Sequence, residues 1–381
     1  MNGKKHSVRM TPLRQDDDLY SEWGYSDGGS CSKVESDHRN YILRKIMFIA
    51  ICFSAVVLSI GLAVTIGQYS IGFFESYGLI WDHIWNGPPE DPMLAMKDHV
   101  VWNLRLPRII VAVISGAGLA VAGAVMQSVL KNPLADPYTT GISSGAAFGA
   151  TLALAYGTSL FSGDLALVGN AFIFSLIPTG TIILISYIRK VSPTSMILAG
   201  IAVMYIFNAL TTVLKLWADP EALSDVYRWQ VGTLEGLQWM DIPTMFVVVL
   251  LGSVLMMILS SKINVLSMGD DGAKSLGLNT SQLRIFCLAV VSLMSAAVVS
   301  FTGVIGFVGL VSPHVVRIFI GADNKYLIPA SAFFGSVLLL VADVIGRVII
   351  APATLQVGVV TAFLGGPLFL YLIIRSKKEV W

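Results

Sequence analysis

Long apolar runs, separated by short polar segments, follow one another from residue 43 to residue 375. A helix that crosses a bilayer needs about 20 mostly apolar residues, because lipid offers its backbone no hydrogen-bond partners. The runs are continuous, whereas strands of a membrane barrel would alternate apolar and polar positions. The pattern therefore predicts an all-α integral membrane protein with about ten transmembrane helices, over residues 43–67, 106–130, 138–157, 165–188, 195–217, 241–262, 283–303, 305–321, 327–347 and 355–375.

The composition agrees with a membrane protein. Of the 381 residues 55% are hydrophobic and 13% charged, against roughly 25% charged residues in soluble proteins. The net charge of +1 argues against a nucleic-acid partner. The three cysteines, Cys31, Cys52 and Cys287, form no metal-binding or disulfide pattern, so we expect packing roles for them, with no metal site and no cofactor.

The two ends of the chain differ from its apolar middle. Residues 1–42 are polar and lack the apolar core of a signal peptide, so we expect a loosely held tail. Residues 43–375 form the predicted transmembrane domain, and residues 376–381 are a short C-terminal tail. The tail at the N-terminus carries no motif that points to a role.

Basic residues indicate the orientation. With ten spans, 19 of the 25 Lys and Arg residues fall on the side that holds both termini, and 6 fall on the other side. Positive charge concentrates in cytoplasmic loops. We therefore place both termini in the cytoplasm of a multi-pass protein of the cell membrane.

Two features suggest how the spans are arranged. Residues 105–137 and 283–317 both read as an arginine, a span rich in small residues and a proline motif, but they run in opposite directions, as in the inverted repeats of transporters. Chance resemblance between apolar segments is the alternative. The small residues of the second span should sit inside the bundle, where they let backbones approach closely: Ser115, Gly116, Gly118, Ala120, Gly123 and Ala124.

Charges at the predicted outer face have two interpretations. Arg105 and Arg108 flank Pro107 where the second span begins, and Arg347 lies one turn after Asp343 in the ninth span, where the two can neutralise each other. The arginines could be anchors whose side chains extend to the membrane surface. They could instead form one basic surface that docks acidic groups of an outside partner, since the guanidinium binds carboxylates through two hydrogen bonds.

The predicted cytoplasmic loop 263–283 is too long for a simple connection. It holds a short amphipathic stretch with Ala273, Leu276 and Leu278, for which Asp271 is a candidate N-cap. Such a helix could fit a groove on a cytoplasmic partner, or the segment could be an ordinary loop.

The chain lacks a phosphate-binding G-x-x-x-x-G-K-[ST] loop, a zinc-protease motif and a nucleophile elbow. It therefore should not hydrolyse ATP itself, and a membrane enzyme is disfavoured. His314, beside Pro313, is interpreted as a structural or gating residue. An ion-gradient-driven secondary transporter is the remaining alternative, but it would need intramembrane carboxylates, and Asp343 is the only one assigned within a span.

Motifs in a fixed order along the chain resemble those of the permease subunits of iron-siderophore, haem and vitamin B12 ABC importers, the FecCD and BtuC-like family of type II importers. They extend from about residue 43 to residue 375 and leave only the N-terminal tail unmatched. The motifs are Arg105-Leu106-Pro107-Arg108, Gly123-Ala124-Val125-Met126-Gln127, Asn132-Pro133-Leu134-Ala135-Asp136-Pro137, Gly141-Ile142-Ser143-Ser144-Gly145-Ala146, Leu198-Ala199-Gly200, Gly277-Leu278, Gly306-Phe307-Val308-Gly309-Leu310-Val311-Ser312-Pro313-His314, Ala342-Asp343 and Gly358-Val359-Val360-Thr361-Ala362-Phe363-Leu364-Gly365-Gly366-Pro367.

The resemblance implies a homodimer of ten-helix subunits in the lipid membrane, two cytoplasmic ABC ATPase subunits and an extracytoplasmic substrate-binding protein. The substrate would be a metal chelate, with iron-siderophore, haem and cobalamin all possible and an iron chelate favoured. By motif position, the binding protein would dock on Arg105, Arg108 and Arg347, and the gate would involve Asn132 and Leu134 with Thr194 and Ser195. Coupling to the ATPase would use Gly269, Asp270, Asp271, Ala273, Leu276, Gly277 and Leu278.

Overall fold

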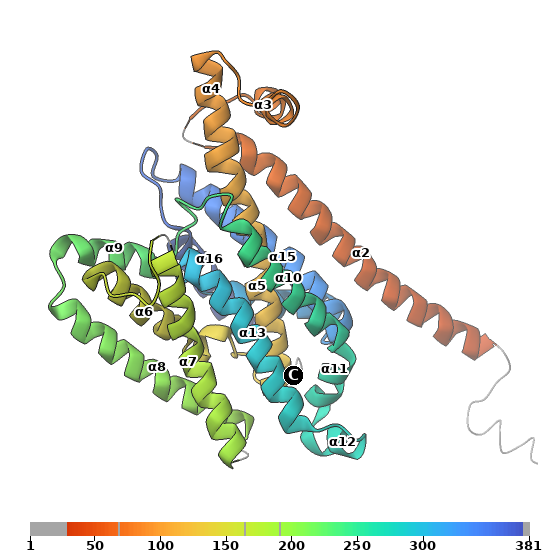
Figure 1. Cartoon of the computed structure of the whole chain (residues 1–381). Coiled ribbons are helices and arrows are strands. Elements are labelled where there is room, and N and C mark those ends of the chain that lie inside the picture. Colours follow the sequence, from red (N-terminus) through yellow and green to blue (C-terminus); the bar gives the residue numbers. More distant parts are fainter. Residues whose placement is uncertain (1–28, 68, 164, 190–191, 376–381) are drawn as a thin grey trace, which may run out of the picture. The chain divides into compact units, whose positions relative to one another are not determined.

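The computed structural model describes residues 29–67, 69–163, 165–189 and 192–375. Within these ranges the regular elements are all helices (Figure 1). The predictions for residues 1–28 and for the C-terminal tail 376–381 lie outside the described residues. The first helix, α2 (Gly29–Thr65), begins well before the predicted span at residue 43, so part of the predicted loose tail is helical.

The chain divides into two compact units, Met1–Met47 and Phe48–Trp381. The smaller unit contains the first part of α2. The larger unit contains the rest of α2 and the remaining helices, which are α3 (Phe73–Asn86), α4 (Pro92–His99), the π-helix η1 (Val100–Arg105), α5 (Leu106–Leu130), the 3-10 helix η2 (Pro137–Thr140), α6 (Ile142–Tyr156), α7 (Leu165–Arg189), α8 (Pro193–Leu216), α9 (Pro220–Val231), α10 (Ile242–Ile258), α11 (Ser260–Met268), α12 (Asp270–Ser275), α13 (Thr280–Thr302), α14 (Val308–Ile320), α15 (Asn324–Val348) and α16 (Val357–Arg375).

Six described helices are long and apolar enough to cross a membrane: Arg39–Thr65 within α2, the continuous helix Pro92–Leu130, α7, α8, α13 and α15. The pair α10 and α11, bent by 59° at its break, brings the number to seven if it counts as one span. Three shorter apolar helices follow, over Ile142–Tyr156, Val308–Ile320 and Val357–Tyr371. Each predicted span overlaps one of these helices, so the chain is a multi-pass α-helical membrane protein.

Helix α5 lies at the centre of the larger unit and is buried along almost its whole length (Figure 1). The small residues that the sequence assigns to the bundle interior are buried there, which confirms that prediction. A β-carbon on Gly123 would lie 1.8 Å from the carbonyl oxygen of Gly309 in α14, and one on Gly116 would lie 2.4 Å from that of Gly335 in α15. Glycine is therefore required where α5 touches these two helices, because any side chain would collide with backbone.

The segment between α5 and α6 folds back into the bundle, which the sequence did not predict. Gly309 lies beside Leu119, in the middle of α5, and Asp136 lies beside Gly309. Residues near Asp136 are thus at the depth of mid-α5, so α6 begins at Ile142 and is shorter than the predicted span 138–157. Irregular backbone is tolerated at this depth because protein surrounds it and supplies partners.

Three helices in the connections were also missed: α3, α9 and α4, of which α4 continues through η1 into α5. Helices α3 and α9 lack the long apolar run by which a span is recognised, because polar residues interrupt both of them.

Replacing Gly123 by alanine should destabilise the protein, since the new methyl group meets a backbone carbonyl that cannot move independently. Overpacking of this kind costs about 1–3 kcal/mol. Gly180→Ala in α7 is the matched control, because no atom lies within 4 Å of the position that its new methyl group would occupy. Thermal unfolding of purified protein in detergent should show a lower midpoint for the first variant alone; equal midpoints would contradict the packing described for α5.

Candidate functional site

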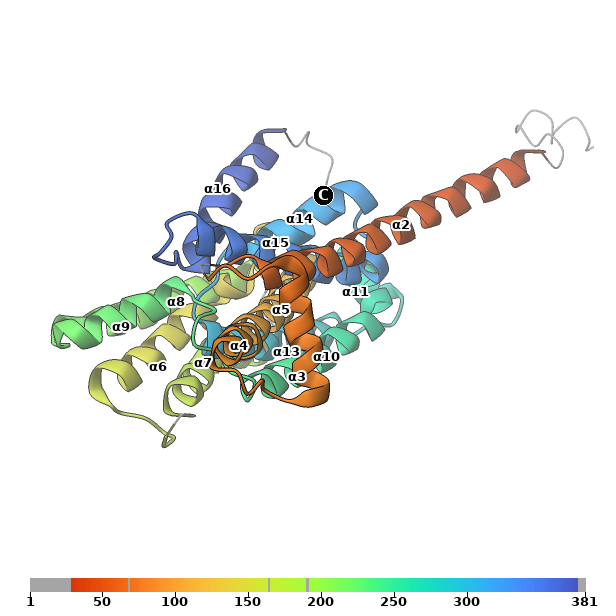
Figure 2. The ribbon, with the colours of Figure 1, turned by 90° about the horizontal axis from the view of Figure 1, so that it is seen from above.

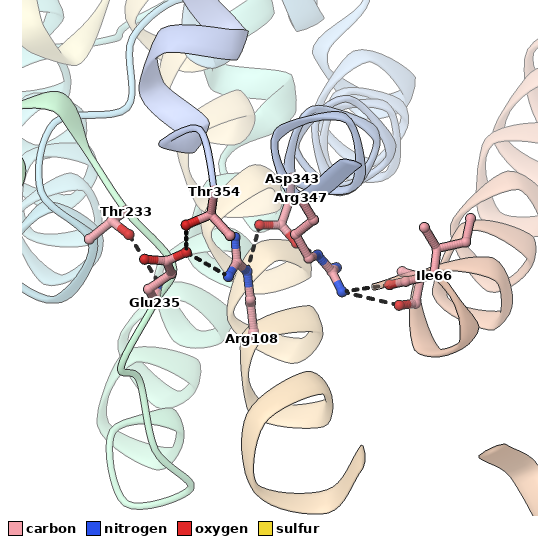
Figure 3. Close-up of polar contacts among 8 residues, drawn as sticks. Ile66, Arg108, Thr233, Glu235, Asp343, Arg347 and Thr354 are labelled. Carbon is pink, nitrogen blue, oxygen red and sulfur yellow. Dashed lines mark hydrogen bonds and ion pairs between the residues drawn. The ribbon is translucent and has the colours of Figure 1, made fainter. Parts of the chain in front are cut away.

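One buried carboxylate organises a cluster of charged residues where α5 begins and α15 ends (Figure 3). Asp343 is fully buried. Its Oδ2 accepts a hydrogen bond from Arg347 Nη2 at 2.5 Å, and its Oδ1 accepts one from Arg108 Nε at 2.7 Å. The predicted pairing of Asp343 with Arg347 one turn later is confirmed, and Arg108 is a second partner that only the fold brings near.

Two arginines of the cluster bind the C-terminal end of α2. Arg105 donates to the carbonyl oxygens of Val64 at 2.7 Å and Thr65 at 3.2 Å in the last turn of α2, and to that of Tyr69, in the segment after the helix, at 2.5 Å. Arg347 donates to those of Ala63 and Ile66, both at 3.2 Å. The last carbonyls of a helix lack partners within the helix, and cations are favoured at that end. These contacts therefore cap α2.

The cluster is not the exposed basic surface that the sequence suggested. Arg105 and Arg347 are each only 5% exposed, because α2 covers them. The docking role predicted for them stays a prediction, and their internal partners give them a structural role in addition. Arg108 differs, since it also pairs with a carboxylate at the surface.

That surface carboxylate belongs to Glu235, in the connection between α9 and α10. Its Oε1 lies 3.3 Å from Arg108 Nη1 and accepts a hydrogen bond from the Thr354 hydroxyl (Figure 3). Arg108, Glu235 and Thr354 line a cavity of about 850 Å³. The other lining residues are Gly67, Tyr69, His99, Val100, Asn103, Leu104, Arg105, Leu234, Gly236, Leu237, Gln238, Trp239, Met240 and Arg347. The cavity therefore presents both charges and aromatic surface.

Replacing Asp343 by asparagine should lower stability strongly, because two arginines would lose the charge that neutralises them while one of them stays buried. Removing one partner of a buried ion pair costs about 3–5 kcal/mol. Glu235→Gln is the matched control, since Glu235 is 45% exposed and surface pairs contribute about 0–1 kcal/mol. Thermal unfolding in detergent should separate the two variants clearly; similar midpoints would mean that Asp343 is not the organising charge.

A second ionic cluster lies at the other end of α5. Asp270, in the first turn of α12, pairs with Lys131 Nζ at 2.5 Å and with Arg284 Nη2 at 2.9 Å. Arg284 is buried in α13 and its Nε donates to the carbonyl oxygen of Val129 in the last turn of α5. Partial burial by itself would raise the pKa of Asp270, but its hydrogen bonds with Lys131 and Arg284 outweigh this and hold the pKa below its ordinary value. Asp270 thus ties α12 to both α5 and α13.

The predicted coupling segment is largely helical, and one detail of its prediction is wrong. The N-cap position of α12 is Gly269, with a φ of 145° that favours glycine, and Asp271 lies inside the helix. Ala273 is fully buried, whereas Leu276, directly after the helix, is 71% exposed. Gly277 has a positive φ of 79° and ends the turn, after which the N–H of Leu278 donates to the carbonyl oxygen of Ala273.

The predicted gate residues lie in two places. Asn132 Oδ1 accepts a hydrogen bond from the N–H of Leu134, and Leu134 is 51% exposed. Thr194 and Ser195 lie in the first turn of α8, where Ser192 caps the helix by accepting from the N–H of Ser195. No hydrogen bond joins the two pairs within the described ranges, so the gate stays a prediction. Asn132 does directly follow Lys131, the partner of Asp270.

Asp136 and His314 are further polar groups inside the bundle. Asp136 caps η2 by accepting from the N–H of Tyr138 at 2.7 Å, and the Tyr138 hydroxyl accepts from the N–H of Ile305 at 3.3 Å. His314 is buried and packs edge to face on Phe369. Asp343 is the only carboxylate that the sequence assigns within a span; Asp136 lies between two spans but at the depth of mid-α5, so it is a further buried carboxylate inside the bundle. The two prolines near Asp136, Pro133 and Pro137, are typical of a surface turn, so its buried position could not be recognised from the sequence.

Comparison with known proteins then decides the family. The model of the FecCD transport family matches residues 49–375. The chain belongs to the FecCD transport family. It is therefore a transporter permease, as its motifs predict.

The similarity to individual family members extends over most of both chains. The haemin transport permease HmuU of Yersinia pestis is 37% identical over 85% of this chain and 94% of its own length. The cobalamin import permease BtuC of Halobacterium salinarum is 36% identical over 84% and 85%. Among solved structures, an inward-facing structure assigned to the metal-chelate type of ABC transporter superposes with a TM-score of 0.75 at 30% identity, over 86% of this chain and 99% of that chain.

Proposed function

We propose that the chain is the permease subunit of an ATP-driven importer that moves a metal chelate across the cell membrane. The observation that carries the proposal is the FecCD family match over residues 49–375, which includes both ionic clusters. The relatives named for haemin and for cobalamin support a large metal-containing chelate as the substrate class. The chain would work as a homodimer with two ATPase subunits and an extracytoplasmic substrate-binding protein.

The membrane topology we propose has ten spans with both termini in the cytoplasm. It counts the bent pair α10–α11 and the short helices α6, α14 and α16 as spans, in addition to the six long ones. The contact between Tyr138 and Ile305 supports the inverted repeat, because it joins the break after α5 to the break after α13. In inverted-repeat transporters such breaks meet near the middle of the membrane.

The Asp270 cluster supports a route for coupling. The ATPase partner would bind the α11–α12 segment, whose residue Leu276 is exposed. A displacement of α12 would pull on Lys131 through Asp270, and Lys131 immediately precedes the proposed gate residue Asn132. A partner can shift the gate only if it binds the two states with different affinity, and a movement of α12 that broke this ion pair would make the contacts of the two states differ.

Asp270→Asn should reduce the amount of substrate transported per ATP hydrolysed several-fold, because the charge that holds Lys131 and Arg284 is lost. Asp271→Asn separates the ion pairs from the partner surface: Asp271 belongs to the same predicted coupling segment but is fully exposed and pairs with Lys274 at 3.8 Å, so its loss leaves the contacts of Lys131 and Arg284 intact and should reduce coupling less than Asp270→Asn. Proteoliposomes containing the complete importer would report both uptake and hydrolysis.

Lys131→Gln tests the same route without altering α12. It should reproduce the coupling loss while the ATPase still binds. Unchanged coupling in both Asp270→Asn and Lys131→Gln would refute this route.

For docking of the substrate-binding protein we propose Arg108 as the contact residue, with Arg105 and Arg347 supporting it from beneath. Arg108 lines the cavity beside Glu235, and its side chain is 13% exposed. A carboxylate of the binding protein would join or replace Glu235 there. Charge reversal at Arg105 is a poor test, because it would also break the cap on α2.

Arg108→Gln should weaken docking about tenfold or more, as expected for loss of a close charge pair. Because this variant also removes one of the two partners of Asp343, its unfolding midpoint is measured alongside, and docking is compared on folded protein. Arg228→Gln in α9 is the control, because Arg228 is exposed and on the same predicted side of the membrane. Titration of the binding protein against the permease in nanodiscs measures the affinity. Equal affinities for the two variants would remove Arg108 from the docking surface.

The alternative function, an ion-driven secondary transporter, has support in one observation only. Asp136 is a second buried carboxylate inside the bundle, but it already caps η2. Uptake by the chain alone in vesicles under a proton or sodium gradient would favour this alternative.

A further inference from the structure

Helix α3 carries an aromatic surface that none of the contacts above explains. Among its 14 residues are two phenylalanines, one tyrosine and two tryptophans. Phe74, Trp81 and Trp85 are 87%, 64% and 68% exposed. The rings of Trp81 and Trp85 lie 5.7 Å apart, so they form a continuous patch with little cover from the rest of the chain.

The exposed residues of α3 separate into two stripes. The apolar stripe consists of Phe73, Phe74, Tyr77, Trp81, Ile84 and Trp85. The polar stripe consists of Asp82 and Asn86 together with Gly78, which has no side chain; the three are spaced by four residues and all exposed. At 3.6 residues per turn these sets fall on adjacent sides of the helix. A surface helix whose exposed residues divide in this way is expected to contact an apolar medium on one side and a polar medium on the other.

The third side of α3 binds the protein. Ser76 and Leu79 are buried, His83 Nδ1 lies 2.8 Å from Asp98 Oδ2, and the His83 ring stacks on Trp102 with centroids 4.1 Å apart. These contacts fix the rotation of the helix, so the two exposed stripes point in set directions.

The position of α3 along the bundle corresponds to the end of a span. The Tyr77 hydroxyl donates to the carbonyl oxygen of Gly61, one turn before α2 ends at Thr65. One turn is about 5.4 Å, so α3 is level with the boundary of the apolar layer. Figure 1 shows α3 almost end-on and α4 lengthwise. Figure 2, turned by 90°, shows α4 end-on and α3 lengthwise. The helix thus lies across the direction of α4.

We propose that α3 lies in the headgroup layer of the membrane, with its aromatic stripe in lipid and its polar stripe in water. Tryptophan and tyrosine are enriched at this depth, where an apolar ring and a polar N–H or O–H are both satisfied. Helices of this kind lie in the plane of the membrane with the apolar face a few ångströms below the headgroups. An acidic docking partner fits the stripe poorly, because the stripe has no cation. The proposal requires only that the chain is embedded in lipid and does not depend on the transported substrate.

Spin labels at adjacent positions test the proposal. Trp81→Cys and Asp82→Cys form one matched pair, and Trp85→Cys and Asn86→Cys form a second; the native Cys31, Cys52 and Cys287 are first replaced by serine or alanine. The full chain is reconstituted in nanodiscs of phosphatidylethanolamine and phosphatidylglycerol. Relaxation by oxygen, which concentrates in lipid, is compared with relaxation by a water-soluble nickel chelate.

Labels at positions 81 and 85 should be several-fold more accessible to oxygen relative to nickel than their neighbours at 82 and 86. High nickel accessibility at all four positions would place α3 in water and overturn the proposal. Low accessibility to both reagents at 81 and 85 would mean that protein, such as a second copy of the chain, covers the stripe, which overturns it equally. Either result would leave the importer function unaffected, since coupling is measured separately.

Discussion

The ion pairs of Asp343 hold together the end of the bundle that contains the cavity lined by Arg108 and Glu235. A carboxylate buried in a membrane protein is costly unless cations neutralise it, and here two arginines from two helices do so. One of them, Arg347, also reaches the carbonyls at the end of α2, as does Arg105. Three helices therefore meet at one point through charges that cannot separate without leaving a bare charge in an apolar environment.

The two ends of α5 differ in how firmly they are held. At the Asp343 end the carboxylate is completely buried, so water and salt cannot screen its pairs. At the other end Asp270 is about one-third exposed, and pairs of this kind are weaker. This difference suits a transport protein in which the end that carries Asp270 moves on a rigid remainder. The glycine contacts of Gly116 and Gly123 join the two ends, since they fix α5 against α15 and α14.

Much of the fold could be predicted from the sequence because lipid imposes a simple rule. The continuous apolar runs predicted where the helices lie, and the small residues predicted that α5 packs inside the bundle. The Asp343–Arg347 pair followed from helical spacing alone. Contacts between distant segments could not be predicted in this way: the carbonyl partners of Arg105 depend on where α2 ends, and the depth of Asp136 depends on how the chain folds back after Leu130.

The same limit applies to the coupling segment and to α3. The region 263–283 could be identified from the sequence, but Asp271 was predicted as the N-cap. The backbone conformation of Gly269, which suits glycine, could not be predicted. Helix α3 was not predicted, because a helix that lies in the plane of the membrane has no apolar run long enough to span a bilayer. In both cases the deciding information lies in backbone geometry or in the location of a neighbouring helix.

The π-helical turn η1 sets the directions in which the two parts of the helix Pro92–Leu130 face their neighbours. A π-helical turn holds more residues than an α-helical one, so it rotates everything before it relative to everything after it. Arg105, at the end of this turn, reaches α2, while Arg108 reaches α15. If the same six residues were wound as a regular α-helix, the parts of the helix before and after them would turn relative to each other by about 100°, and Asp98 would point away from His83. The angular setting of α3 is thus encoded in the winding of another helix.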